Sequence, residues 1–172
     1  IYIFSLLTFE KIIEIPAHSG EINTIDTITN LDNNKAYLSS GGSDNFVSVI
    51  NISEGISNNL NFNENSILEN MDSPVISTVF CIDKNKILKL IVAEAKSITF
   101  FQLLNDSLQS LQKFYDENLN TYCLCYSPAI KKVISGHNGK ISIWKTSSNI
   151  AHKHFQVNKG DTLLDNFRIA SD

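Results

Sequence analysis

Three residues in the first quarter of the chain carry the functional groups of a hydrolytic triad. His18, Ser40 and Asp44 supply a base, a hydroxyl and a carboxylate, the set that serine hydrolases use for acyl transfer. Many such enzymes present the serine on a sharp nucleophile elbow between a strand and a helix, and no elbow surrounds Ser40. We therefore predict a structural role for the three side chains, no catalytic residues and no enzyme activity. An enzymatic function is the least favoured alternative.

Two histidines and two cysteines have the spacing of neighbours on one face of a strand. His152 and His154 flank Lys153, and Cys123 and Cys125 flank a leucine. Such pairs can begin a zinc site, but no third ligand follows at a motif spacing. We expect an exposed histidine pair and buried cysteines that pack as small apolar side chains. We predict no metal and no cofactor.

Length and composition indicate a folded domain. The 172 residues are 42% hydrophobic and 19% charged, which suits a chain with a core of its own. No apolar run approaches the roughly 20 residues that a membrane helix needs, so no membrane partner is expected. The formal net charge of −4 does not favour nucleic acid. Three cysteines make no disulfide framework, which favours a cytoplasmic location, with cytoskeletal or nuclear association left open.

Positive charge is concentrated in one segment. Residues 118–160 hold six lysines and no acidic residue. Nucleic-acid surfaces usually add arginine and aromatic platforms, and the only arginine of the chain is Arg168. We expect a lysine surface that meets an acidic protein, and nucleic-acid or phosphoinositide binding stays open as an alternative. The lysines expected to face a partner are Lys131, Lys132, Lys140 and Lys153.

A short strand pattern recurs along the chain. The order apolar, small, apolar, bulky at 47–50 returns at 1–4, 98–101 and 141–144, in steps of 46, 51 and 43 residues. These steps are close to the ~40–45 residues of a four-stranded propeller blade. Other short apolar runs, separated by Asn, Asp, Ser and Gly, predict antiparallel hairpins. One hairpin turn is predicted at Ser43-Asp44-Asn45, whose side chains suit tight turns.

The residues around these strands resemble the WD-repeat (WD40) β-propeller family. That family has Gly-His before the first strand, then Ser-Gly, an Asp-containing turn and a strand that ends in Trp-Asp. Here Ala17-His18, Ser40-Gly41 and Asp44 stand at the first three positions, and Ile50-Asn51 stands in place of Trp-Asp. The resemblance implies that His18, Ser40 and Asp44 form a hydrogen-bond network that pins the loops of their blade, without the tryptophan.

The later repeats depart further from the family pattern. The last repeat keeps Ser135-Gly136, Asn138 and Trp144-Lys145, with a turn at His137-Asn138-Gly139, and the middle repeat has Ala95 where the aspartate would stand. We therefore expect the middle repeat to keep only the strand pattern, and the hydrogen-bond network to be confined to the first repeat.

The expected architecture is all-β, part of a WD40 β-propeller with four-stranded antiparallel blades. We predict one incomplete propeller over residues 1–172, with about three whole blades and two partial ones. The whole blades are expected near 18–69, 72–116 and 119–157, and the half blades at 1–15 and 161–172.

The order of the degenerate repeats, with GDTLLDNFRIASD after the last one, is similar to the family of WD-repeat scaffolds named for mitogen-activated-protein-kinase-binding protein 1. This resemblance implies a non-catalytic platform for protein–protein interaction within a larger kinase-signalling or microtubule- and spindle-associated scaffold. The expected partners are other proteins and the remaining blades of the same propeller.

Overall fold

A computed structural model describes residues 1–30, 34–53, 66–146 and 152–156, the last range as backbone alone. Every regular element in these ranges is a β-strand, in agreement with the all-β prediction. Within the same ranges, no helix has the length and apolar character needed to cross a membrane. The half blade predicted at 161–172 lies outside the described residues.

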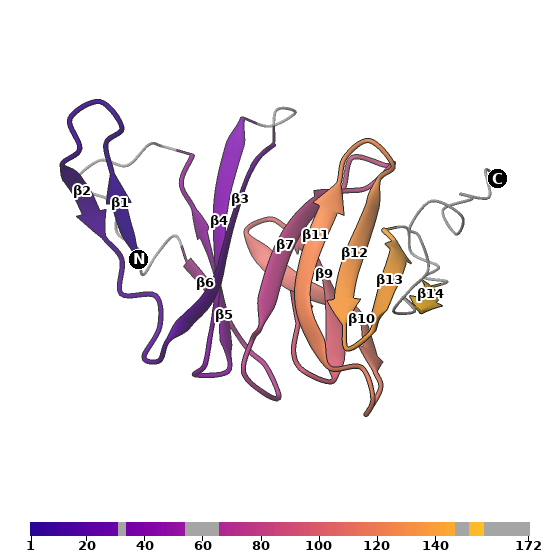
Figure 1. Cartoon of the computed structure of the whole chain (residues 1–172). Helices are drawn as coiled ribbons and strands as arrows, with labels where there is room; N and C mark the ends of the chain where they lie inside the picture. Colours follow the sequence, from indigo (N-terminus) through magenta and orange to yellow (C-terminus); the bar gives the residue numbers. More distant parts are fainter. Residues whose placement is uncertain (31–33, 54–65, 147–151, 157–172) are drawn as a thin grey trace.

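Three four-stranded antiparallel sheets and one hairpin follow one another along the chain (Figure 1). The N-terminal hairpin pairs β1 (Tyr2–Phe4) with β2 (Lys11–Glu14). The first blade consists of β3 (Ile22–Asn30), β4 (Lys35–Gly42), β5 (Phe46–Asn51) and β6 (Ser66–Asn70). The middle blade consists of β7 (Ser77–Ile82), β8 (Leu88–Ala93), β9 (Ser97–Leu104) and β10 (Ser107–Tyr115). The last blade consists of β11 (Thr121–Ser127), β12 (Lys132–His137), β13 (Lys140–Lys145) and β14 (His152–Gln156).

Each sheet is a simple meander, in which consecutive strands pair through hairpins. The turn predicted at 43–45 is confirmed, and Asn45 adopts a left-handed conformation there with φ of 67°. Asparagine tolerates this region better than most residues. Strand β6 has no counterpart among the predicted strands, because its sequence SILEN alternates too briefly to stand out.

The core forms layers between successive sheets. Val47 and Val49 of β5 are buried against the middle blade, and Ile98 and Phe100 of β9 are buried against the last blade. These four side chains are at most 1% exposed, as expected for alternate residues of a strand that packs between two sheets. The equivalent residues of β13, Ile141 and Ile143, are only half-buried.

The first strands of the three blades, β3, β7 and β11, lie next to one another. We call them the inner strands. Because every blade has the same meander, the turns that join first to second strands lie at one end of the molecule, upper in Figure 1, and those that join second to third strands lie at the other. We call the former the upper end and the latter the lower end.

Candidate functional site

The predicted network of the first blade lies at the lower end. His18 Nδ1 is 3.0 Å from Asp44 Oδ1, and His18 Nε2 is 2.8 Å from Ser40 Oγ. Asp44 also accepts hydrogen bonds from the backbone N–H groups of Ser19 and Phe46. Burial alone would raise the pKa of Asp44, but these hydrogen bonds outweigh burial and lower the pKa to about 2. The ionised carboxylate fixes the loop before β3 against the turn between β4 and β5.

The distances within this network are those of a hydrolytic triad. Unlike the residues of an active site, however, its serine and histidine are closed off from solvent. The Ser40 residue is 0% exposed and the His18 side chain is also 0% exposed. A nucleophile has to lie within bonding reach of a substrate carbonyl, and no substrate reaches a hydroxyl that is fully enclosed by protein. The same three residues therefore hold the blade together, and their burial leaves a substrate no access to the hydroxyl.

Gly42 explains how the His18 ring fits beside the hairpin. A Cβ atom at position 42 would lie 2.6 Å from His18 Nδ1 and 2.6 Å from Asp44 Oδ1. Real Cβ atoms do not approach other atoms so closely, so the ring needs a glycine beneath it.

The last blade builds a second network that the sequence analysis did not expect. His137 follows Gly136 just as Gly42 follows Gly41 in the first blade. The imidazole ring of this network therefore comes from the end of β12, whereas that of His18 comes from the loop before β3. Its Nε2 atom is 2.7 Å from Ser135 Oγ, its Nδ1 atom is 3.2 Å from Thr121 Oγ1, and Trp144 Nε1–H donates to Ser135 Oγ at 2.7 Å. The expectation that only the first blade has such a network is therefore wrong.

The middle blade has a carboxylate where the other two blades have a histidine. Glu94 follows Ala93 at the same hairpin position and is 1% exposed. Its Oε1 atom accepts the backbone N–H of Ser73 at 2.7 Å, and its Oε2 atom accepts hydrogen bonds from Ser97 Oγ and from Lys113 Nζ, the latter at 2.9 Å. Burial raises the pKa of Glu94, but the hydrogen bonds from Ser97, Lys113 and Ser73 outweigh it and the pKa lies below its usual value. The middle repeat thus keeps more than a strand pattern.

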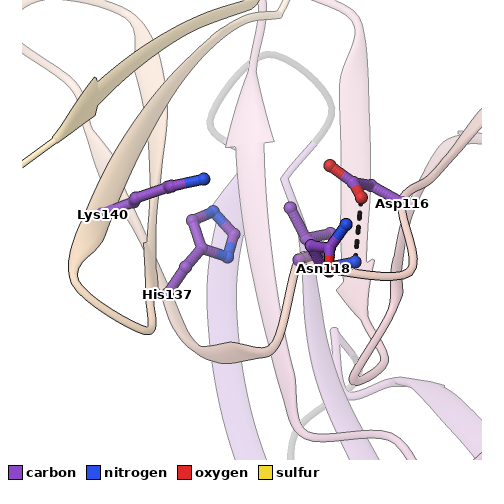
Figure 2. A pocket seen from close by; sticks show the side chains of 5 residues that line it. Asp116, Asn118, His137 and Lys140 are labelled. Atoms are coloured by element: carbon purple, nitrogen blue, oxygen red, sulfur yellow. Dashed lines mark hydrogen bonds between the residues drawn. The ribbon is translucent and has the colours of Figure 1, made fainter.

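We call the three groups the blade pins; they are centred on His18, Glu94 and His137. The first two connect the loop that enters a blade to the hairpin between its second and third strands, and the third connects the first residue of β11 to that hairpin. A small pocket of about 140 Å³ lies beside the pin of the last blade. Figure 2 shows Asp116 and Asn118 on one side of it and His137 and Lys140 on the other, with the Asn118 N–H donating to Asp116. The pocket is well below the ~300–1,000 Å³ of ligand sites.

Polar side chains also join neighbouring blades along the inner strands. Thr24 Oγ1 accepts the Thr78 N–H at 3.2 Å, and Ser77 Oγ accepts the Leu124 N–H at 3.0 Å. Thr24 and Ser77 pair with equivalent positions of their second strands, so the same contact is repeated one blade later. Asp26 Oδ2 adds a hydrogen bond from the Phe80 N–H at 2.7 Å. These contacts fix each blade on the next.

An open groove runs along the three inner strands and reaches the upper end. Its volume is about 820 Å³, and we call it the inner groove. Its walls come from residues 24–29 of β3, 77–80 and 82 of β7, and 124–126 of β11. At the upper end it is lined by Lys84, Lys86 and Lys131.

The lysines that were expected to face a partner do not form one surface. Lys131 is exposed and Lys132 half-buried at the upper end, whereas Lys140 lies at the lower end beside the pocket of Figure 2. Strand β12 separates the two sites by about 17 Å. The side chain of Lys153 lies outside the described residues. Two further lysines at the upper end, Lys84 and Lys86, come from the middle blade, which the composition of residues 118–160 could not reveal.

The expected burial of two cysteines is wrong. Cys123 and Cys125 are exposed, because both point away from the middle blade on the inner strand of the last one. The described residues contain no group of three or more metal-ligating side chains. The side chains of His152 and His154, both in β14, lie outside the described residues.

The chain is similar to proteins of known structure. No protein-family model matches the chain, and no curated protein matches it. Among solved structures 145 chains match. A chain in the "Crystal Structure of Mitotic Checkpoint Complex" aligns with a TM-score of 0.62 and 19% sequence identity. The alignment covers 89% of this chain and 44% of that one, so this chain spans less than half the length of the solved chain. Together with its four-stranded antiparallel blades, this likeness shows an all-β fold that resembles a WD40 β-propeller.

Proposed function

We propose that the chain is a non-catalytic platform for protein–protein interaction. The observation that carries this proposal is the burial of the serine–histidine–aspartate set of the first blade: Ser40 is 0% exposed, and its Oγ atom lies 2.8 Å from His18 Nε2. The polar groups that resemble catalytic machinery instead fix loops, and the blades present rigid surfaces. Rigid, preformed surfaces lose little entropy on binding, which suits an interaction platform.

The finer proposal is a scaffold in kinase signalling or in microtubule- and spindle-associated assemblies. Its support is the order of the degenerate repeats, together with a neighbour whose structure is titled as a mitotic checkpoint complex. The partners would be other proteins and further blades of the same propeller, in a cytoplasmic setting with cytoskeletal or nuclear association. Lys131 and Lys132 at the upper end would meet an acidic partner.

Two measurements on the full chain test this proposal. Quantitative mass spectrometry of proteins captured from a cell extract at physiological salt should recover a defined set of proteins, with kinase-module or tubulin-associated components among them. Hydrolysis of a generic activated ester should be the same for the wild type and for Ser40→Ala. Recovery of RNA or phosphoinositide in place of protein would favour the alternative, and turnover that Ser40→Ala abolishes would overturn the non-catalytic assignment.

A further inference from the structure

We propose that Asn138 is a site of spontaneous deamidation, in which the backbone nitrogen of Gly139 attacks its side-chain amide, and that this modification weakens the pin of the last blade with time. The two residues form the turn between β12 and β13 at the lower end. The proposal is independent of the interaction function, because the reaction needs only this chain and water.

The reaction joins the side-chain amide to the backbone of the next residue. The Gly139 nitrogen forms a bond to the side-chain carbonyl carbon of Asn138, and the bond from that carbon to the amide nitrogen breaks. The amide nitrogen leaves as ammonia and takes the proton of the Gly139 N–H. One water molecule then opens the resulting succinimide ring. Opening at one carbonyl gives aspartate, and opening at the other gives isoaspartate, whose main chain runs through the former side chain.

The residue after Asn138 is the one that hinders this ring closure least. Asn138-Gly139 is the only asparagine–glycine pair in the chain. In every other pair, the Cβ atom of the second residue obstructs the approach of its nitrogen, whereas glycine has no Cβ and a freer backbone. Gly139 has a left-handed φ of 67°, and a Cβ atom there would meet no heavy atom within 4 Å apart from its chain neighbours. The turn therefore has room to form the ring.

Hydrogen bonding distinguishes Asn138 from a second exposed asparagine at the same pocket. Within the part of the chain that the structure describes, neither the Asn138 side chain nor the Gly139 N–H makes a hydrogen bond, and both residues are exposed. Asn118 lies on the opposite side of the pocket (Figure 2) and is also exposed. Its next residue is Leu119, whose N–H donates to the Asp116 carbonyl at 3.0 Å. The attacking nitrogen is thus available at the first asparagine and held in place at the second.

The modification reaches the pin of the last blade through the backbone of the turn. His137 pairs with Lys140 across the two turn residues, and its ring lies 2.7 Å from Ser135 Oγ and 3.2 Å from Thr121 Oγ1. Isoaspartate adds one atom to the main chain between the paired residues, so their register is lost and the ring moves relative to its partners. Loss of one hydrogen bond of the pin lowers the melting temperature of a chain of this size by about 2–4 °C.

The test incubates the full chain in neutral buffer at physiological temperature, beside a synthetic peptide with the sequence of residues 136–140, until the peptide has reacted. Peptide mass spectrometry locates deamidated asparagines, and protein isoaspartate methyltransferase with labelled S-adenosylmethionine measures isoaspartate. We expect both products at Asn138 of the native protein, an unmodified Asn118 and the fall in melting temperature given above. An intact Asn138 beside a reacted peptide would overturn the proposal, because the fold would then protect the site. Equal deamidation of Asn118 would overturn it as well.

Two matched variants separate the reaction from its effect on the pin. Asn138→Gln keeps an amide in the turn but lengthens the side chain by one carbon, which slows ring closure, so its melting temperature should stay constant during the incubation. Asn138→Asp carries the charge of the aspartate product on an unchanged backbone, and when freshly purified it should melt as the fresh wild type does. An equal decline of the wild type and Asn138→Gln, or a fresh Asn138→Asp as unstable as the incubated wild type, would overturn the inferred effect of isoaspartate on the pin.

Discussion

Lys89 and Asp83 form a buried ion pair in which Nζ lies 3.1 Å from Oδ2 and neither side chain is more than 5% exposed. Lys89 Nζ also donates to the Thr146 carbonyl of the last blade. Asp83 Oδ1 accepts the backbone N–H groups of Asn85 and Ile87. The pair thus connects a turn of the middle blade to its neighbour.

Loss of the ammonium group should destabilise the protein strongly. Lys89→Met keeps the volume but leaves the Asp83 carboxylate buried without its counter-charge, so the free energy of unfolding should fall by about 3 kcal/mol. Chemical denaturation measures it. Lys84→Met, at an exposed position one residue from Asp83, should change the value by less than about 0.5 kcal/mol. Equal stabilities of the two variants would show that the buried pair contributes nothing.

The first blade pin should couple Gly42 to His18. Gly42→Ala places a Cβ atom 2.6 Å from His18 Nδ1, and such overpacking typically costs about 1–3 kcal/mol. In a His18→Ala background the ring is absent, so the same change should cost less. A double-mutant cycle by thermal denaturation measures the difference, and strict additivity of the two changes would contradict the arrangement.

The middle blade pin depends on two carboxylate oxygens. Glu94→Gln replaces one acceptor with an amide group that faces Lys113, Ser97 or the Ser73 N–H, all of which now donate to Glu94. The mismatch should lower the free energy of unfolding by about 2–3 kcal/mol. The exposed Glu117→Gln serves as the control, and a middle blade as stable with glutamine as with glutamate would refute the pin.

Asp44 should make stability depend on acid pH. Its pKa is about 2 in the folded protein against an ordinary value of 3.8, so the folded state favours the ionised form. Its contribution, at most about 2 kcal/mol, is therefore present above pH 4 and is lost as the pH falls from about 4 to 2. Melting temperatures of the wild type should drop over this range more steeply than those of Asp44→Asn; parallel curves would contradict this assignment.

The three cysteines should differ in reactivity. Cys123 and Cys125 are exposed, whereas Cys81 is 0% exposed and burial raises its pKa to about 12. Iodoacetamide at neutral pH should modify the first two in the native protein and Cys81 only after unfolding, because the thiolate is the reactive form. Peptide mass spectrometry distinguishes the sites. Native labelling of Cys81 would contradict the packing of the middle blade.

The third strands could be predicted from sequence because packing leaves them little choice. β5 and β9 bury apolar side chains on both faces, Val47 and Val49 toward one neighbour and Ile50 toward the other. Such strands keep a pattern that is visible in every repeat. The half-exposed β6 has no such constraint, and its pattern was missed.

The blade pins could be predicted only in part. Counting back from the third strand places Ala95 at the position of Asp44, whereas counting forward from the second strand places Glu94 at the position of Gly42. The two alignments differ because the turn has five residues between Gly41 and Val47 but four between Ala93 and Ile98. The first alignment alone hides Glu94, and it gives His137 a place in a turn but no place in a hydrogen-bond network. Because the turn of the first blade is one residue longer than that of the middle blade, equivalent positions in the two turns point in different directions. The carboxylate of the pin therefore comes from Asp44 in the first blade and from Glu94 in the middle blade.

The Thr78 N–H donates to Thr24 Oγ1 and the Leu124 N–H donates to Ser77 Oγ, and these two hydrogen bonds cover the edges of β7 and β11. An unpaired edge strand can recruit a strand from another molecule and so begin aggregation. In β7 and β11 the amides that would do so are already occupied by hydroxyl groups of the preceding blade. The protein thereby protects two edge strands that contain no proline, and a loss of either hydroxyl would show itself as self-association and faster amide exchange before any change in the core.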